Sequence, residues 1–111
     1  MNELRGQISI ELGKDTHEVL LNLNCFRLLC RDKKMELTAL DEFVNSDPLD
    51  FVPTVIYWGI MNASDRKAEQ RPEINYDHMS AIICSDLEKF QELSEAVGQS
   101  MGSTGGSKGG N

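Results

Sequence analysis

The chain has 111 residues, and its 18 acidic and 11 basic side chains give a formal net charge of −7. A chain of this length is expected to form one domain too small for a deep catalytic cleft, and its acidic balance argues against nucleic-acid binding, which depends on clustered Lys and Arg. No apolar run approaches the about 18 residues of a membrane span, and the first residues lack a signal peptide's pattern, so we expect a cytoplasmic protein that does not associate with membranes.

Residues 7–12 alternate between apolar and polar side chains, with Ile8, Ile10 and Leu12 on one side. Gly, Lys and Asp at 13–15 provide turn chemistry, and residues 17–21 resume an extended pattern. This arrangement predicts an N-terminal β-hairpin.

Two helices are expected next. Asn22 or Asn24 is a suitable cap for a first helix that ends near residues 32–34, where Lys side chains suit a helix C-terminus. Residues Thr38 to Asp41 resemble a capping box with Asp in place of Glu, followed by an apolar stripe that stops at residues 45–46. The second helix is therefore expected to be short.

The stretch 47–62 predicts a well-defined central helix, because Asp47 is a strong N-cap, Pro48 suits the first helical position and Asp50 complements the helix dipole. Its apolar residues surround the whole helix. One face carries Phe51, Val52, Val55, Ile56, Gly59 and Ile60, and the other carries Tyr57, Trp58 and Met61. We favour a helix that is half core and half interface, with the second face exposed.

Gly59 costs this helix about 1 kcal/mol relative to Ala. Either another backbone passes close to this position, or the glycine is simply tolerated in a well-packed helix.

Residues 63–71 carry no hydrophobic period and precede Pro72, which predicts a loop or a frayed helix end. Asn75 is expected to cap a further helix, and a capping box at residues 85–88 begins a last one. That last helix presents Leu87, Phe90, Leu93 and Val97 on one face. From Gly98 the sequence is rich in Gly and Ser, which predicts a flexible, disordered tail. The expected organisation is an α+β domain over 1–97, with a β-hairpin and about four to five α-helices, and a tail over 98–111.

No catalytic or metal constellation is evident. Cys25, Cys30 and Cys84 make an odd count without metal-ligand spacing, and we interpret all three as reduced core thiols. His17 and His78 lack a Cys or carboxylate partner at a spacing that would define a shared site. We therefore expect no catalytic residue, no metal and no cofactor, and we favour a binding or assembly protein over an enzyme.

Four segments resemble, in their order, the tail assembly chaperones of long-tailed, siphophage-type bacteriophages and prophages. They are residues 8–14 (Ile-Ser-Ile-Glu-Leu-Gly-Lys), 24–30 (Asn-Cys-Phe-Arg-Leu-Leu-Cys), 47–51 (Asp-Pro-Leu-Asp-Phe) and 55–60 (Val-Ile-Tyr-Trp-Gly-Ile). The similarity covers residues 1 to about 97, and Tyr57 to Ile60 is its most specific element. Trp58 and Ile60 depart from the small residue and Leu that are usual there, and Pro53 is a further departure.

The resemblance implies a chaperone in the bacterial host cytoplasm that binds and solubilises the tape measure protein, helps recruit the tail tube protein and is absent from the mature virion. In that family a fraction of translation commonly shifts frame near the end of the short product. The alternatives are a structural tail-completion protein of the virion and a small acidic regulator or nucleic-acid mimic. The candidate partner-binding residues, which also fit a possible homo-oligomer, are Phe51, Val55, Tyr57, Trp58 and Met61.

Overall fold

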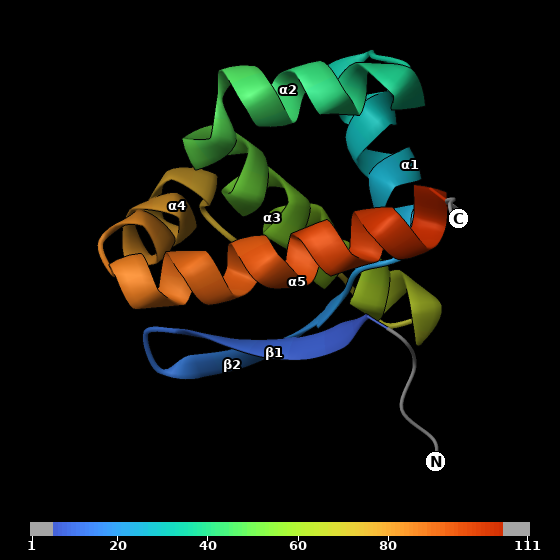
Figure 1. Cartoon of the computed structure of the whole chain (residues 1–111). Coiled ribbons are helices and arrows are strands. Elements are labelled where there is room, and N and C mark those ends of the chain that lie inside the picture. Colours follow the sequence, from blue (N-terminus) through green and yellow to red (C-terminus); the bar gives the residue numbers. More distant parts are fainter. Residues whose placement is uncertain (1–5, 106–111) are drawn as a thin grey trace.

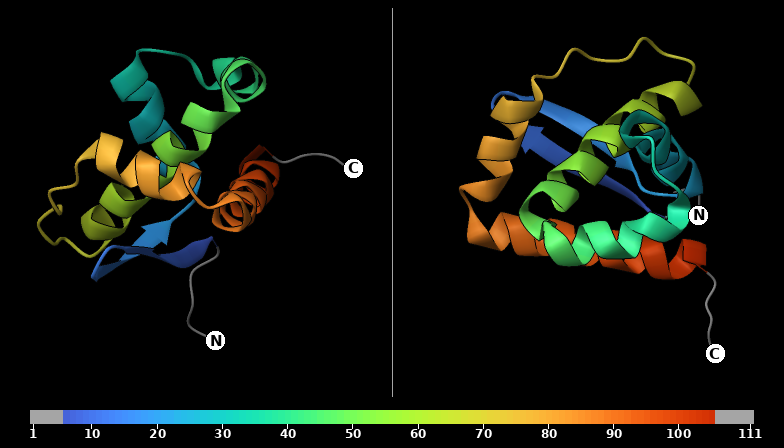
Figure 2. Two further views of the ribbon diagram at one scale, coloured as in Figure 1. Left: turned by 90° about the vertical axis from the view of Figure 1, so that its left-hand side faces the viewer. Right: turned by 90° about the horizontal axis from the view of Figure 1, so that it is seen from above.

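The computed structural model describes residues 6–105, and helix α3 (Pro48–Arg66) is the element around which the others pack (Figure 1). The α+β architecture expected from the sequence is confirmed. Helix α3 contacts strand β2 (Asp15–Leu20) and the helices α1 (Leu23–Lys33), α2 (Leu40–Ser46), α4 (Tyr76–Cys84) and α5 (Leu87–Gly105). Figure 2 shows the hairpin on one side of α3 and the connection from α3 to α4 extending from the body of the domain.

The predicted β-hairpin is confirmed. Strand β1 (Gln7–Leu12) pairs antiparallel with β2, and the last pair of the register is Leu12 with Asp15. The two-residue turn begins with Gly13 at φ 68°, a conformation in which glycine meets no steric penalty. Ile10 and Leu12 are buried while Glu11 between them is exposed, as the alternation predicts.

Helix α1 is capped by Asn22, whose side-chain oxygen accepts a hydrogen bond from the backbone N–H of Cys25 at 3.2 Å. This decides between the two asparagines considered from the sequence. The capping box predicted at Thr38 is wrong, because this residue lies inside a short 3₁₀ helix, η1 (Leu37–Ala39), and no side chain caps α2. The end of α2 at Ser46 is as expected.

Helix α3 begins at Pro48 as predicted, but the side chain of Asp47 makes no capping hydrogen bond. Only its backbone carbonyl takes part in the helix start, accepting from the N–H of Phe51 at 2.8 Å. The helix also continues to Arg66 rather than ending at Asn62, because Ala63 is still packed into the protein with 7% exposure.

Pro53 lies inside α3 and has no N–H to donate to the carbonyl of Leu49, four residues earlier. The thiol of Cys84 at the end of α4 donates to that carbonyl instead, with a sulfur–oxygen distance of 3.6 Å. The proline is therefore accommodated without ending the helix.

Both of the last two helices are capped by side chains, one at the predicted residue and the other one residue later than predicted. Asn75 caps α4 as expected, accepting from the N–H of His78 at 2.8 Å. Asp86, not Ser85, provides the capping oxygen of α5, which accepts from the N–H of Lys89 at 3.1 Å. Leu87 is 70% exposed and does not join the core face predicted for it.

Helix α5 continues to Gly105, so the predicted boundary at residue 97 and the start of the tail at Gly98 are too early. Ser100 is buried at 7% exposure and Met101 packs against the core. Together with Leu93 and Val97 they extend the buried stripe of the helix by i, i+4, i+7 and i+8 spacing. The composition of this segment predicts disorder because composition takes no account of the spacing of the buried residues. Residues 106–111 of the predicted tail lie outside the described residues.

Candidate partner-binding site

The five candidate partner-binding residues divide into buried and accessible ones. Phe51, Val55 and Met61 are core residues with exposures of 2%, 0% and 3%, so the expectation that they are available to a partner is wrong. The reason is that one strand and four helices pack around α3, more than its apolar pattern alone indicates. Tyr57 and Trp58 are half-buried, and they remain the accessible part of the second face.

Three aromatic rings meet at this surface. Tyr57 and Trp58 have ring centroids 5.2 Å apart with an interplanar angle of 86°, and Tyr57 and Tyr76 have centroids 6.0 Å apart at 78°. Such edge-to-face contacts are favoured by the quadrupoles of the rings. Tyr76 is the first residue of α4, and the candidate residues chosen from the sequence did not include it. The signal that could have found it is that a tyrosine hydroxyl near a surface usually has a polar partner.

The Tyr76 hydroxyl is fixed by residues of the first turns of α3. It donates to the carboxylate of Asp50, lies 3.2 Å from the Asp50 carbonyl oxygen and 3.0 Å from Oγ1 of Thr54. Burial, followed by the hydrogen bond to Asp50, raises the pKa of Tyr76 to about 12. Asp50 therefore holds the aromatic group in place in addition to complementing the helix dipole.

Two hollows lie on either side of Tyr57. The first, which we call the aromatic hollow, has a volume of about 320 Å³ and is lined by Asp32, Lys33, Thr54, Tyr57, Trp58 and Tyr76. The second, the loop hollow, has a volume of about 570 Å³ and is lined by Tyr57, Met61 and residues 71–75. Tyr57 is common to both, so this side chain forms the ridge between them.

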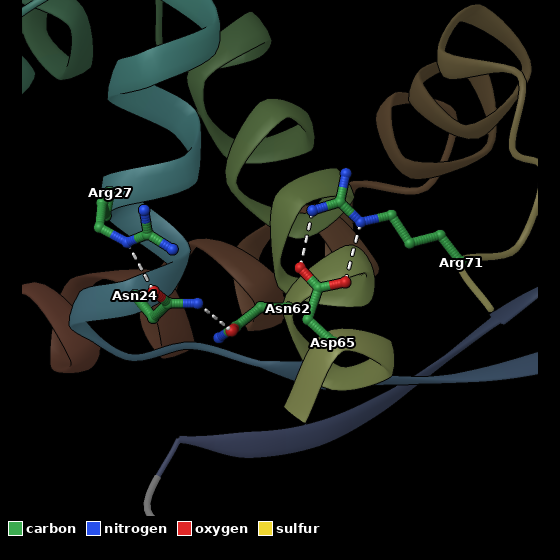
Figure 3. Close-up of polar contacts among 5 residues, drawn as sticks. All are labelled: Asn24, Arg27, Asn62, Asp65 and Arg71. Atoms are coloured by element: carbon green, nitrogen blue, oxygen red, sulfur yellow. Dashed lines mark hydrogen bonds and ion pairs between the residues drawn. The ribbon is translucent and has the colours of Figure 1, made fainter. Parts of the chain in front are cut away.

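Arg71 fastens the connection between α3 and α4 to this surface. Its guanidinium donates two hydrogen bonds to the Asp65 carboxylate, at 2.9 and 2.7 Å (Figure 3). The bond from Arg71 holds the pKa of Asp65 below its ordinary value. The same guanidinium lies 5.7 Å from the centroid of the Trp58 ring, within the range of a cation–π interaction.

Lys67, four residues before Arg71, forms an ion pair with Glu18 of β2 at 2.5 Å. The hydrogen bond from Lys67 lowers the pKa of Glu18. Lys67 and Arg71 are therefore both paired with carboxylates of the same domain, which makes them less suitable for binding an anionic partner.

A buried amide that sequence reasoning missed joins three elements beside this surface. Asn62 is 2% exposed, and its Nδ2 donates to the carbonyl of Leu20 at 2.9 Å and to Oδ1 of Asn22 at 2.8 Å. Its Oδ1 accepts from Nδ2 of Asn24 at 2.8 Å, and Asn24 in turn accepts from Arg27 (Figure 3). The only signal in the sequence was an amide at the end of an otherwise apolar run. Its contacts are structural, since they link β2, α1 and α3.

The three cysteines have different environments. Cys25 is buried, and burial raises the pKa of its thiol to about 12, as expected for an unreactive core residue. Cys84 is exposed, so the prediction that it is a core thiol is wrong. Within residues 6–105, no group of three or more His, Cys, Asp and Glu side chains could hold a metal ion. None of the described helices is long and apolar enough to cross a membrane.

Comparisons with protein-family models, with curated proteins and with solved structures find no match to this chain. Its function is therefore inferred from its own residues, above all from the aromatic surface and the two hollows beside it.

Proposed function

We propose that this chain is a phage or prophage tail assembly chaperone that binds and solubilises the tape measure protein in the bacterial host cytoplasm. It would also help recruit tail tube subunits and be absent from the mature virion. The observation that carries the proposal is the half-buried aromatic surface of Tyr57, Trp58 and Tyr76 with a hollow on each side of Tyr57. The order of sequence segments that resembles this family supports the same function.

This surface suits a helical partner. Aromatic side chains held in place by their own domain dominate binding energy at many interfaces, because they bury a large area at low entropic cost. Two adjacent hollows separated by one ridge fit successive side chains of an amphipathic helix, which presents anchors three or four residues apart. The net charge of −7 would keep the complex soluble once the apolar stripe of the partner is covered.

Two ionisable side chains near the surface, Asp50 and Arg71, support binding rather than chemistry. Asp50 accepts a hydrogen bond from Tyr76, and Arg71 is paired with Asp65. Each of these groups has a structural partner that already accounts for its position.

The test is co-expression with fragments of the tape measure protein encoded in the same genomic neighbourhood, followed by measurement of the soluble fraction. The wild-type chain should raise that fraction, and the double variant Tyr57→Ser with Trp58→Ser should not. Leu87→Ser is the matched control, because Leu87 is a large exposed apolar residue that lines neither hollow. Circular dichroism and thermal melting establish that each variant is folded.

A folded double variant that still solubilises the fragment would show that the binding surface lies elsewhere. A wild-type chain that fails with every fragment would contradict the chaperone function itself. Mass spectrometry of purified phage particles tests whether the protein is part of the virion. A chaperone is expected to be absent from the particles, whereas a tail-completion protein would be present in stoichiometric amounts.

A further inference from the structure

We infer that the aromatic hollow binds one arginine side chain presented by the partner segment. This inference deepens the proposed function and rests on it, because it specifies the chemistry of the residue that the chaperone surface recognises.

The walls of the aromatic hollow are suited to a cation. Tyr57, Trp58 and Tyr76 all line it, and the ring pairs at interplanar angles of 86° and 78° present faces in different directions. A ring face attracts a cation through its quadrupole, and the attraction increases when the cation is partly desolvated between rings. The chain itself provides a precedent, since the Arg71 guanidinium lies over the Trp58 ring without being among the residues that line this hollow.

One acidic side chain in the lining of the hollow also favours a cation. The carboxylate of Asp32 is exposed and has no hydrogen bond or ion pair to any of the described residues. It lies in the last turn of α1, where a carboxylate is unfavourable because the negative end of the helix dipole is there. The position of Asp32 is therefore not explained by the stability of the helix, and its carboxylate is available to pair with a cation that enters the hollow.

Among the described residues, Lys33 is the one cation that lines the aromatic hollow, and its charge opposes a second cation. Its Nζ lies 5.9 Å from the centroid of the Phe43 ring, so its ammonium group is already engaged with an aromatic residue outside the lining. The carboxylate of Asp50 accepts a hydrogen bond from the hydroxyl of Tyr76, which lines the hollow, so a second negative charge lies near it.

Size and shape favour arginine over other cations of a partner. A volume of about 320 Å³ is at the lower end for a ligand pocket and suits a single long side chain. A planar guanidinium can stack on a ring face and pair with a carboxylate in two-pronged geometry, which an ammonium group cannot do.

The experiment uses the full-length chain and the fluorescence of Trp58, its only tryptophan. The protein is titrated with N-acetyl-arginine amide and, in a separate experiment, with N-acetyl-citrulline amide, which has nearly the same shape without the charge. We expect a saturable change in emission with the arginine compound only. Asp32→Asn should weaken binding roughly threefold to fivefold, and Lys33→Gln should strengthen it. Asp41→Asn is the control, because Asp41 is an exposed acid of α2 outside the hollow and should leave the affinity unchanged.

Equal responses to the arginine and citrulline compounds, or an unchanged affinity in Asp32→Asn, would overturn the inference. Tighter binding of free L-arginine than of the amide would indicate a small-molecule site and would overturn it as well. The proposed function is tested separately. If the tape measure fragment is solubilised but the arginine compound does not bind, the chaperone function stands and the inference fails. If the arginine compound binds but no fragment is solubilised, the aromatic hollow is an arginine-binding site and the chaperone function fails.

Discussion

Gly59 of α3 lies directly against Val19 of β2: a Cβ atom at position 59 would be 2.5 Å from Cγ1 of Val19. It would also lie 3.6 Å from the carbonyl oxygen of Leu20, which confirms that a second backbone passes close to this glycine. Val19 is fully buried and β-branched, so it has little freedom to move aside. The contact sets how closely the hairpin packs on the central helix.

Gly59→Ala should therefore destabilise the protein by about 1 to 3 kcal/mol through overpacking, although alanine is the better helix former. Gly98→Ala in α5 is the matched control, because a Cβ there would meet no atom within 4 Å. That substitution should stabilise the protein by up to about 1 kcal/mol. Urea denaturation of both variants gives the two free energies of unfolding, and a stabilising Gly59→Ala would show that the hairpin can shift.

Replacing Asn62 by Leu should lower the free energy of unfolding by about 1 to 3 kcal/mol, since the buried carbonyl of Leu20 and the side chain of Asn22 would each lose a donor. Asn45→Ala, at an exposed position of α2, should change it by less than about 0.5 kcal/mol. Chemical denaturation measures both changes in the free energy of unfolding. Equal changes would mean that water makes the hydrogen bonds that the Asn62 amide makes in the wild-type protein.

The two aspartates at helix starts should behave differently. Asp86→Ala should cost about 1 kcal/mol because the Asp86 side chain accepts from the N–H of Lys89. Asp47→Ala should cost less, because the Asp47 side chain makes no capping bond. Thermal melting of the two variants ranks them, and the reverse order would show that Asp47 caps α3 in solution.

Removing residues 98–105 should lower the melting temperature by roughly 5 °C or more relative to a chain that ends at Gly105. The loss is expected because Ser100 is buried and Met101 packs against the core. Differential scanning calorimetry on the two truncated chains makes the comparison. Equal melting temperatures would restore the domain boundary at residue 97.

Stability should fall as the pH rises from about 10, the ordinary pKa of tyrosine, to about 12, the pKa of Tyr76 in the folded protein. In this range the folded state keeps the Tyr76 proton that the unfolded state releases, so each increment of pH favours unfolding. Tyr76→Phe should remove this part of the pH dependence. Denaturant midpoints measured across the range test it, and the same slope in both proteins would contradict a Tyr76 hydroxyl held in its neutral form.

Local sequence patterns determined the kinds of element and most of their starts. The alternation of Ile8, Ile10 and Leu12 specifies the hairpin, and Pro48 marks the first residue of α3, because both signals act over a few residues. The apolar stripe of α5 was equally local, but the glycines from Gly98 obscured it. Capping was less predictable, since Asp47 has a favoured cap side chain and yet its carboxylate makes no capping hydrogen bond.

Which face of α3 remains accessible was decided only by the tertiary structure. Met61 is apolar and lies beside Tyr57 in the sequence pattern, yet it is buried while Tyr57 forms the ridge between two hollows. Burial of a helix face depends on how many other elements pack around it, and the connections of the chain fix that number. The aromatic hollow likewise combines Asp32 of α1, Trp58 of α3 and Tyr76 of α4. These residues are far apart in the sequence and line one hollow only because α1 and α4 both pack against α3.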